Sequence, residues 1–343
     1  MNKLEKQHSK STFGGVIQKL KSSREAGLLL IIIVLVLLIH LKSGSFLSVK
    51  TFSDMFKNYS TTFTLALGMM GVLLVGGIDI AIAATMGFSG MAASLLMRDG
   101  VYSSTVIMFL VSTAIGLLCG LLIGLVISYG GVIPIIATLG FMNIYRGATY
   151  IISDSQWVSA YQFDKNFKAF AQSKSLSFGL INNLFFITIL CYIVMFIVMK
   201  WTKFGRKIYA VGSNPEAANV SGIKTKRVKL AVYGLSGLFA GITGAMYTAL
   251  YASAQNDMGL GMEMDAIASC VIGGVSLSGG SGSVLGVFLG AMTMAIISKS
   301  LPMIGVSQFW QTAIKGAIIL IAIIINVLVQ RTARKSALKE REI

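Results

Sequence analysis

The stretch "LLLIIIVLVLLIHL", Leu28–Leu41, decides the fold because it is almost purely aliphatic. Leu184–Met199 and Ala317–Val329 have the same character. Of the 343 residues, 55% are hydrophobic and 12% are charged, and the mean hydropathy is +0.78. Many segments reach the roughly 20 residues with which a helix crosses a bilayer, and a span in lipid must satisfy its own backbone polar groups. The alternating pattern of a membrane β-barrel is missing. We therefore predict an all-α polytopic membrane protein.

About ten apolar segments follow one another, and we predict a transmembrane helix in each. Two regions, 76–90 and 273–286, are broken by glycines, and either could be a re-entrant or discontinuous helix. The predicted transmembrane domain covers 26–330, between basic tails at 1–25 and 331–343. The spans form two five-helix halves, at 26–42, 55–76, 80–97, 104–128, 132–152, 180–200, 229–252, 264–280, 284–301 and 308–330.

The net charge of +16 is concentrated in three places, which argues against a nucleic-acid partner. Residues 1–24 carry six Lys and Arg, 200–229 carry eight and 331–343 carry five, together 19 of 29. Even numbers of predicted spans separate these blocks, so all three lie on one side, which the positive-inside rule makes cytoplasmic. A basic face for anionic lipid is compatible with this. Both termini are then cytoplasmic, and 153–178 is the largest outer loop.

The largest inner loop, 201–228, contains "GSNPEAANVSG", Gly212–Gly222. Ser213 and Glu216 have the spacing of a capping box, while Asn214 is itself a good cap with Pro215 at the first helical position. Gly222 is a natural helix stop. So short a helix is marginal alone and needs something to pack on. The ordinary alternative is an amphipathic loop helix lying on the membrane surface.

Four blocks resemble the monosaccharide-type permeases of ABC importers, in family order. They are "VGGIDIAIAATMGFSG" (Val75–Gly90), "IPIIATLGFMNIYRGATYIIS" (Ile133–Ser153), "FGRKIYAVGSNPEAANVSGI" (Phe204–Ile223) and "GMEMDAIASCVIGGVSLSGGSGSVLG" (Gly261–Gly286). Branched-chain amino-acid permeases are relatives but lack the G-G-I-D block. Ala81, Ala83-Ala84, Phe141 and Asn143 depart from the sugar-permease pattern, which puts the preferred substrate in doubt.

The resemblance implies partners as well as a fold. "EAANVSG" matches the E-A-A-x-x-x-G core of a short cytoplasmic coupling helix that is held by an ATPase subunit. We therefore expect this chain to bind no cofactor, with ATP used by the partner. An outer solute-binding protein would deliver substrate, and a second permease copy or a homologous permease would complete the pathway in a bacterial cell membrane. The residues expected at the ATPase contact are Ser213, Asn214, Pro215, Glu216, Ala217, Ala218 and Gly222.

A few polar residues inside the apolar segments are candidates for the pathway or for helix packing. Charges at depth tend to be paired or functional. Asp79 either lines the route, braces two helices or caps a helix near the inner interface, and capping is favoured. Arg146 is expected to face the bundle and to bond to a carboxylate or to carbonyls. Asp79 and a sugar hydroxyl are possible partners, and a structural ion pair is favoured. Lys315 can snorkel. The other candidates are Gly76, Gly77, Asn143, Asp265, Gly273 and Gly274, the glycines because paired interruptions in two halves mark a site or close packing.

No stretch carries the G-x-x-x-x-G-K-[ST] phosphate loop, and "GGVSLSGGSGS" lacks its lysine. His8 and His40 are far apart, and Cys119, Cys191 and Cys270 stand singly in apolar segments. We therefore predict no catalytic residue and no metal site.

The favoured function is the permease subunit of a ribose-like sugar importer. Import of autoinducer-2 or of a deoxysugar is the alternative within the family. An ion-coupled secondary transporter would need several intramembrane acids, and Asp79 and Asp265 are the only serious candidates. A channel is disfavoured because no repeated selectivity filter is present.

Overall fold

The computed structural model describes residues 24–177, 179, 181–307, 309–321 and 323–324. The predicted tails therefore lie almost entirely outside the described residues. In the described part the β-type pairing consists of one isolated antiparallel bridge, between Val158 and Ala254. The α-helices are α2 (Arg24–Ser43), α3 (Val49–Leu74), α4 (Ile82–Arg98), α5 (Thr105–Ser128), α6 (Pro134–Ile152), α7 (Lys165–Gln172), α8 (Asn183–Trp201), α9 (Lys203–Ser213), α10 (Pro215–Val220), α11 (Thr225–Tyr251), α12 (Met262–Ile272) and α13 (Val284–Met303). A further apolar helix covers Phe309–Ile321.

A helix occupies each of the ten predicted spans, which confirms the all-α polytopic prediction. Among the described residues, six helices are long and apolar enough to cross a membrane: α2, α5, α6, α8, α11 and α13. Helix α3 starts six residues before its predicted span because Ser48 caps it, accepting a hydrogen bond from the Thr51 amide at 3.1 Å. Residues 325–330 of the last predicted span lie outside the described part.

Helix α12 is shorter than the span predicted for 264–280. It has 11 residues and ends at Ile272, so it extends about 16 Å at 1.5 Å per residue, roughly half of a bilayer core. The chain leaves the helix at Gly273 and Gly274, where φ reaches 84°. The continuous span was therefore the wrong prediction, and the discontinuous alternative is what the structure contains.

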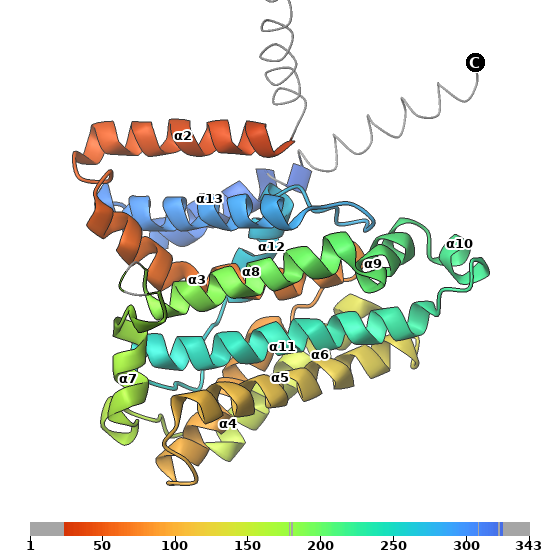
Figure 1. Cartoon of the computed structure of the whole chain (residues 1–343), viewed down its shortest axis with the longest axis horizontal. Coiled ribbons are helices and arrows are strands. Elements are labelled where there is room, and N and C mark those ends of the chain that lie inside the picture. The colour runs from red at the N-terminus through yellow and green to blue at the C-terminus, as the bar shows by residue number, and fades with distance from the viewer. Residues whose placement is uncertain (1–23, 178, 180, 308, 322, 325–343) are drawn as a thin grey trace, which may run out of the picture.

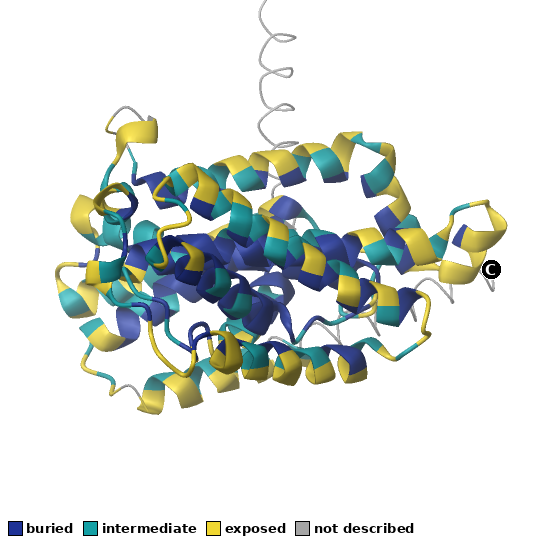
Figure 2. Cartoon of the chain, turned by 90° about the horizontal axis from the view of Figure 1, so that it is seen from below, coloured by how far each residue is buried: buried dark blue, intermediate teal, exposed yellow. Residues whose placement is uncertain are grey.

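Helices α3 and α11 form the centre of the bundle. Every residue of α3 from Ser60 to Leu74 is buried, and most of α11 is buried as well. Figure 1 shows α2, α12 and α13 on one side of this pair and α4, α5 and α6 on the other. Figure 2 shows the buried segments gathered inside a shell of exposed turns. A helix that is covered on all sides lies inside the bundle, so α3 and α11 form its internal pair.

Glycine stripes bring α5 and α11 into backbone contact. Gly116 and Gly120 on α5 lie against Gly237 and Gly241 on α11, and a Cβ at Gly237 would lie 2.7 Å from the Gly120 Cα. The Ser112 hydroxyl donates a 2.7 Å hydrogen bond to the Gly241 carbonyl at the same crossing. Small residues spaced by four allow such close approach of membrane helices.

The two ends of the bundle differ. Helices α9 and α10 project at one end, while α7 and the rest of the segment 153–177 cover the other (Figure 1). Helix α7 is amphipathic and buries Phe167 and Ala171 against the core. Helix α2 begins at the end where α9 and α10 lie (Figure 1).

Candidate functional site

Helix α10 is a short, exposed knob. The Asn214 side chain caps it by accepting a 3.0 Å hydrogen bond from the Ala217 amide, and Pro215 occupies the first turn. Of its six residues only Ala218 is buried, while Val220 is 90% exposed. Gly222, with φ of 82°, ends it. Glu216 lies exposed in the first turn, so the helix presents one acidic and several small apolar side chains to a partner.

The predicted capping box is wrong. Ser213 is the last residue of α9, and the cap of α10 is Asn214 alone. The prediction also missed α9 itself, which places Ile208, Val211 and Gly212 in the core and leaves basic residues outside. Apolar residues spaced by three and four in "FGRKIYAVG" were the available signal.

The end of α9 packs against two glycine loops. The first, 75–81, connects α3 to α4, and the second, 273–283, connects α12 to α13. The Gly280 amide donates a 2.9 Å hydrogen bond to the Leu74 carbonyl, joining the second loop to the end of α3. Gly212 lies so close that a Cβ there would overlap the Leu74 carbonyl oxygen. The Tyr209 hydroxyl adds a 2.9 Å hydrogen bond to the Gly282 carbonyl. The end of α9 is thereby in direct contact with the end of α3 and with the loop between α12 and α13.

The glycines predicted to pair between halves share this end of the bundle. Gly76 and Gly77 follow the second helix of the first half, whereas Gly273 and Gly274 follow the third helix of the second half. The interruptions therefore do not occupy corresponding places, and that part of the expectation is wrong. A Cβ at Gly279 would lie 2.9 Å from the Gly76 amide and 2.8 Å from the Gly212 carbonyl oxygen.

Asp79 is fully buried and braces the first glycine loop to α11. It is 1% exposed, and its Oδ2 accepts a 2.7 Å hydrogen bond from the Ser236 hydroxyl. Within the described residues, its Oδ1 and the nearby Tyr233 hydroxyl make no hydrogen bond. Gly77 leaves room for that hydroxyl, since a Cβ there would lie 2.5 Å from it. The inter-helix brace is the role that this geometry supports.

We expect Asp79→Ala to lower the stability of the folded chain. The substitution leaves the buried Ser236 hydroxyl without its acceptor, and such a loss costs about 1–3 kcal/mol. Thermal unfolding in detergent should show a reduced midpoint for Asp79→Ala. Asp99→Ala, which removes only a surface pair with Arg98, should leave the midpoint close to that of the native chain. Equal midpoints for the native chain and Asp79→Ala would contradict the brace.

Arg146 does not pair with Asp79. Its Nη1 donates a 2.8 Å hydrogen bond to the Met258 carbonyl, so it holds the loop between α11 and α12. The favoured ion pair is therefore wrong, and the alternative, a bond to a carbonyl, is what the structure contains, because the loop between α11 and α12 packs against Arg146. Lys315 does pair, with Asp265 at 3.3 Å. Asn143 is exposed on α6 and donates to the Leu139 carbonyl of its own helix.

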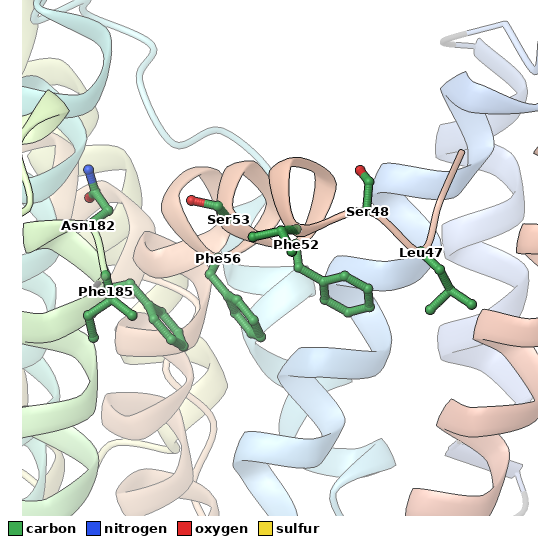
Figure 3. A pocket seen from close by; sticks show the side chains of 9 residues that line it. Leu47, Ser48, Phe52, Ser53, Phe56, Asn182 and Phe185 are labelled. Atoms are coloured by element: carbon green, nitrogen blue, oxygen red, sulfur yellow. The ribbon is translucent and has the colours of Figure 1, made fainter. Parts of the chain in front are cut away.

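An apolar groove opens where the connection from α2 to α3 meets the start of α8. The rings of Phe56 and Phe185 stack with centroids 4.4 Å apart. Figure 3 shows these rings and that of Phe52 on one side, with Ser48 and Asn182 directed to the other. Its apolar lining suits hydrocarbon better than a polar solute.

These features together define a membrane transport protein: a buried helical pair, few internal charges, and an exposed capped helix joined to internal loops. The chain belongs to the family described as branched-chain amino acid transport system / permease component, whose sequence model matches residues 53–323. It is the permease subunit of a transport system and a bacterial membrane protein.

Individual relatives are named for sugars. The chain is 34% identical over 324 residues to the galactose/methyl galactoside import permease protein MglC of Escherichia coli K12, covering 91% of this chain and 96% of MglC. It is 32% identical over 323 residues to the ribose import permease protein RbsC of Bacillus subtilis 168, covering 94% and 97%. No solved structure matches the chain. The resemblance to monosaccharide-type ABC permeases is confirmed by these matches.

Proposed function

We propose that this chain forms the pathway of an ABC importer that carries a neutral monosaccharide. The observation that carries the proposal is the capped, exposed α10, which is seated through α9 on both glycine loops. An exposed, capped helix of this kind offers a preformed contact surface for another protein. A separate ATPase subunit that holds α10 would supply this motion, with ATP bound there. The chain itself would hold no nucleotide or metal and would catalyse no reaction.

The two ends then take opposite roles. The α10 end is cytoplasmic, as are both termini, in accord with the basic residues of 200–229 and with α2 starting at that end. The opposite end, with the loop 153–178, receives a solute-binding protein.

A second copy, or a homologous permease, completes the pathway along the open face of α6. Gly140 and Gly147 have nothing within 4 Å of a built Cβ, and Asn143 is exposed between them. The Asn143 amide oxygen would be costly against lipid, because hydrocarbon offers it no partner. Gly316 on the last helix is equally open. We place these two faces at the junction between the copies.

The names of the relatives support galactose or ribose as substrate. Autoinducer-2 and deoxysugars stay as alternatives. Ion coupling is less well supported, because Asp265 is neutralised by Lys315.

Uptake of labelled sugar by intact cells tests the proposal. Cells with the complete transport system should take up D-galactose or D-ribose, and deletion of this chain alone should abolish that uptake. Competition by unlabelled autoinducer-2 or L-rhamnose separates the alternatives. Uptake that is unchanged by the deletion for all of these solutes would contradict the proposal.

A further inference from the structure

A polar cavity of about 300 Å³ lies at the end of the bundle opposite to α10. Its walls come from the first half of α3, the end of α11, the loop 252–261 and the start of α12. Its volume is at the lower limit of ordinary small-molecule sites, which span roughly 300–1,000 Å³. It therefore has room for one compact solute.

Aromatic rings form one wall of the cavity. Tyr247 and Tyr251 lie with ring centroids 4.5 Å apart at an interplanar angle of 47°, and Tyr59 faces the same space from α3. The Tyr251 side chain is exposed, with 57% of its surface accessible. Tyrosine offers both an apolar face and a hydroxyl. Such a wall suits a molecule with a C–H face and hydroxyl groups around its edge.

Polar groups of the cavity are available to a ligand. Within the described residues, the side chains of Asn58, Gln255 and Asp257 make no hydrogen bond, although all three line the cavity. Between them they offer amide donors, amide acceptors and carboxylate acceptors. A hydroxyl can donate to one such group while accepting from another, so a polyol matches this set.

The charges in and around the cavity are only partly paired. Asp265 in the wall is paired with Lys315 at 3.3 Å. Arg146 holds the wall from outside through the Met258 carbonyl, and the carboxylates of Glu263 and Asp257 lie near it. Three carboxylates against two cations give an anion no advantage, and a carboxylate is an acceptor for the hydroxyl groups of a neutral polyol.

We propose that this cavity is an entry site for a neutral monosaccharide, at which the sugar rests before it enters the pathway. The C–H face of the sugar ring packs on Tyr251 and Tyr247, and its hydroxyls bond to Asn58, Gln255 and Asp257. The inference rests on the proposed function, and it adds the residues that first receive the substrate.

Saturation-transfer difference NMR tests the site without requiring transport. The full chain in lipid nanodiscs is mixed with D-galactose and, separately, with D-ribose. We expect saturation transfer to the ring protons of at least one sugar with the native chain, and an apparent affinity about tenfold lower in Tyr251→Ala/Asp257→Asn, since tenfold corresponds to the loss of about 1.4 kcal/mol. Tyr129→Ala removes a ring that is 50% exposed at the end of α5, away from the cavity, and should behave as native.

Two results would overturn the entry site: no transfer to either sugar with the native chain, or equal transfer with the double variant. Uptake by cells separates this failure from failure of the proposed function. If the double variant loses saturation transfer and also raises the KM of uptake, the site is supported. If uptake by the native chain persists and the double variant transports with unchanged KM, the importer stands and the entry site falls. If the native chain supports no sugar uptake, both fall.

Discussion

Replacing Gly237 with leucine is expected to abolish the folded protein. Gly237 lies at the crossing of α5 and α11, where a Cβ would lie 2.7 Å from the Gly120 Cα and would overlap the Gly116 carbonyl oxygen. A larger side chain must force the two backbones apart, and α11 is central to the core. Overpacking costs about 1–3 kcal/mol even in milder cases, and here three further heavy atoms follow the Cβ. Monodisperse protein after detergent extraction should fall to background.

Gly27→Leu is the matched control for this experiment. A Cβ at Gly27, on α2, meets nothing within 4 Å, so the same substitution should leave yield and elution unchanged. Native-like yield and thermal stability for Gly237→Leu would show that α5 and α11 do not pack through their glycines.

Replacing Gly212 with valine is expected to uncouple transport while the ATPase subunit stays bound. Gly212 lies at the end of α9, where any Cβ overlaps the Leu74 carbonyl oxygen and lies 2.6 Å from the Gly280 amide. The added atoms must push α9 away from both glycine loops. A cost of about 1–3 kcal/mol for the native contact of α9 with the loops corresponds to roughly fivefold to 160-fold in the population of that contact. Sugar uptake should fall by at least about fivefold.

The exposed surface of α10 is unchanged in Gly212→Val, so the ATPase subunit should still co-purify with it. Co-purification therefore distinguishes loss of the contact between α9 and the glycine loops from loss of the ATPase subunit. The separate control variant Gly27→Val should transport as native. Uptake within twofold of native by Gly212→Val would show that the contact of α9 with the glycine loops is not needed for coupling.

Much of the fold follows from the sequence because apolar segments of bilayer length have few alternatives to spanning helices. The places of α2, α5 and α8 were predicted in this way. The end of α12 was not, since a glycine pair permits a turn without requiring one. Which helices pair also escapes a single sequence: the glycines of α5 and α11 predict close packing but do not name the partner.

The candidate site shows the same division. The cap at Asn214 and the stop at Gly222 are local, and the sequence predicted both. The partners of Asp79 and Arg146 are set by packing between distant segments, and the predicted pair is replaced by Ser236 and the Met258 carbonyl. Nothing local in the sequence distinguishes a hydroxyl from a guanidinium as the group that reaches a buried carboxylate. The cavity at the outer end joins four segments, which no single motif could reveal.

Coupling of transport to ATP depends most on α10 being held by an ATPase subunit, and affinity purification of the tagged chain in mild detergent tests this directly. Cells should express the complete transport system. Glu216 is exposed in the first turn of α10, so Glu216→Lys reverses a contact charge without disturbing the core. Asp99→Lys makes the same charge change in an exposed residue at the end of α4, at the opposite end of the bundle.

We predict that an ATPase subunit is recovered with the native chain and with Asp99→Lys, and that it is lost with Glu216→Lys. A native chain that purifies without such a subunit, and that still moves solute into vesicles free of ATP, would contradict the account.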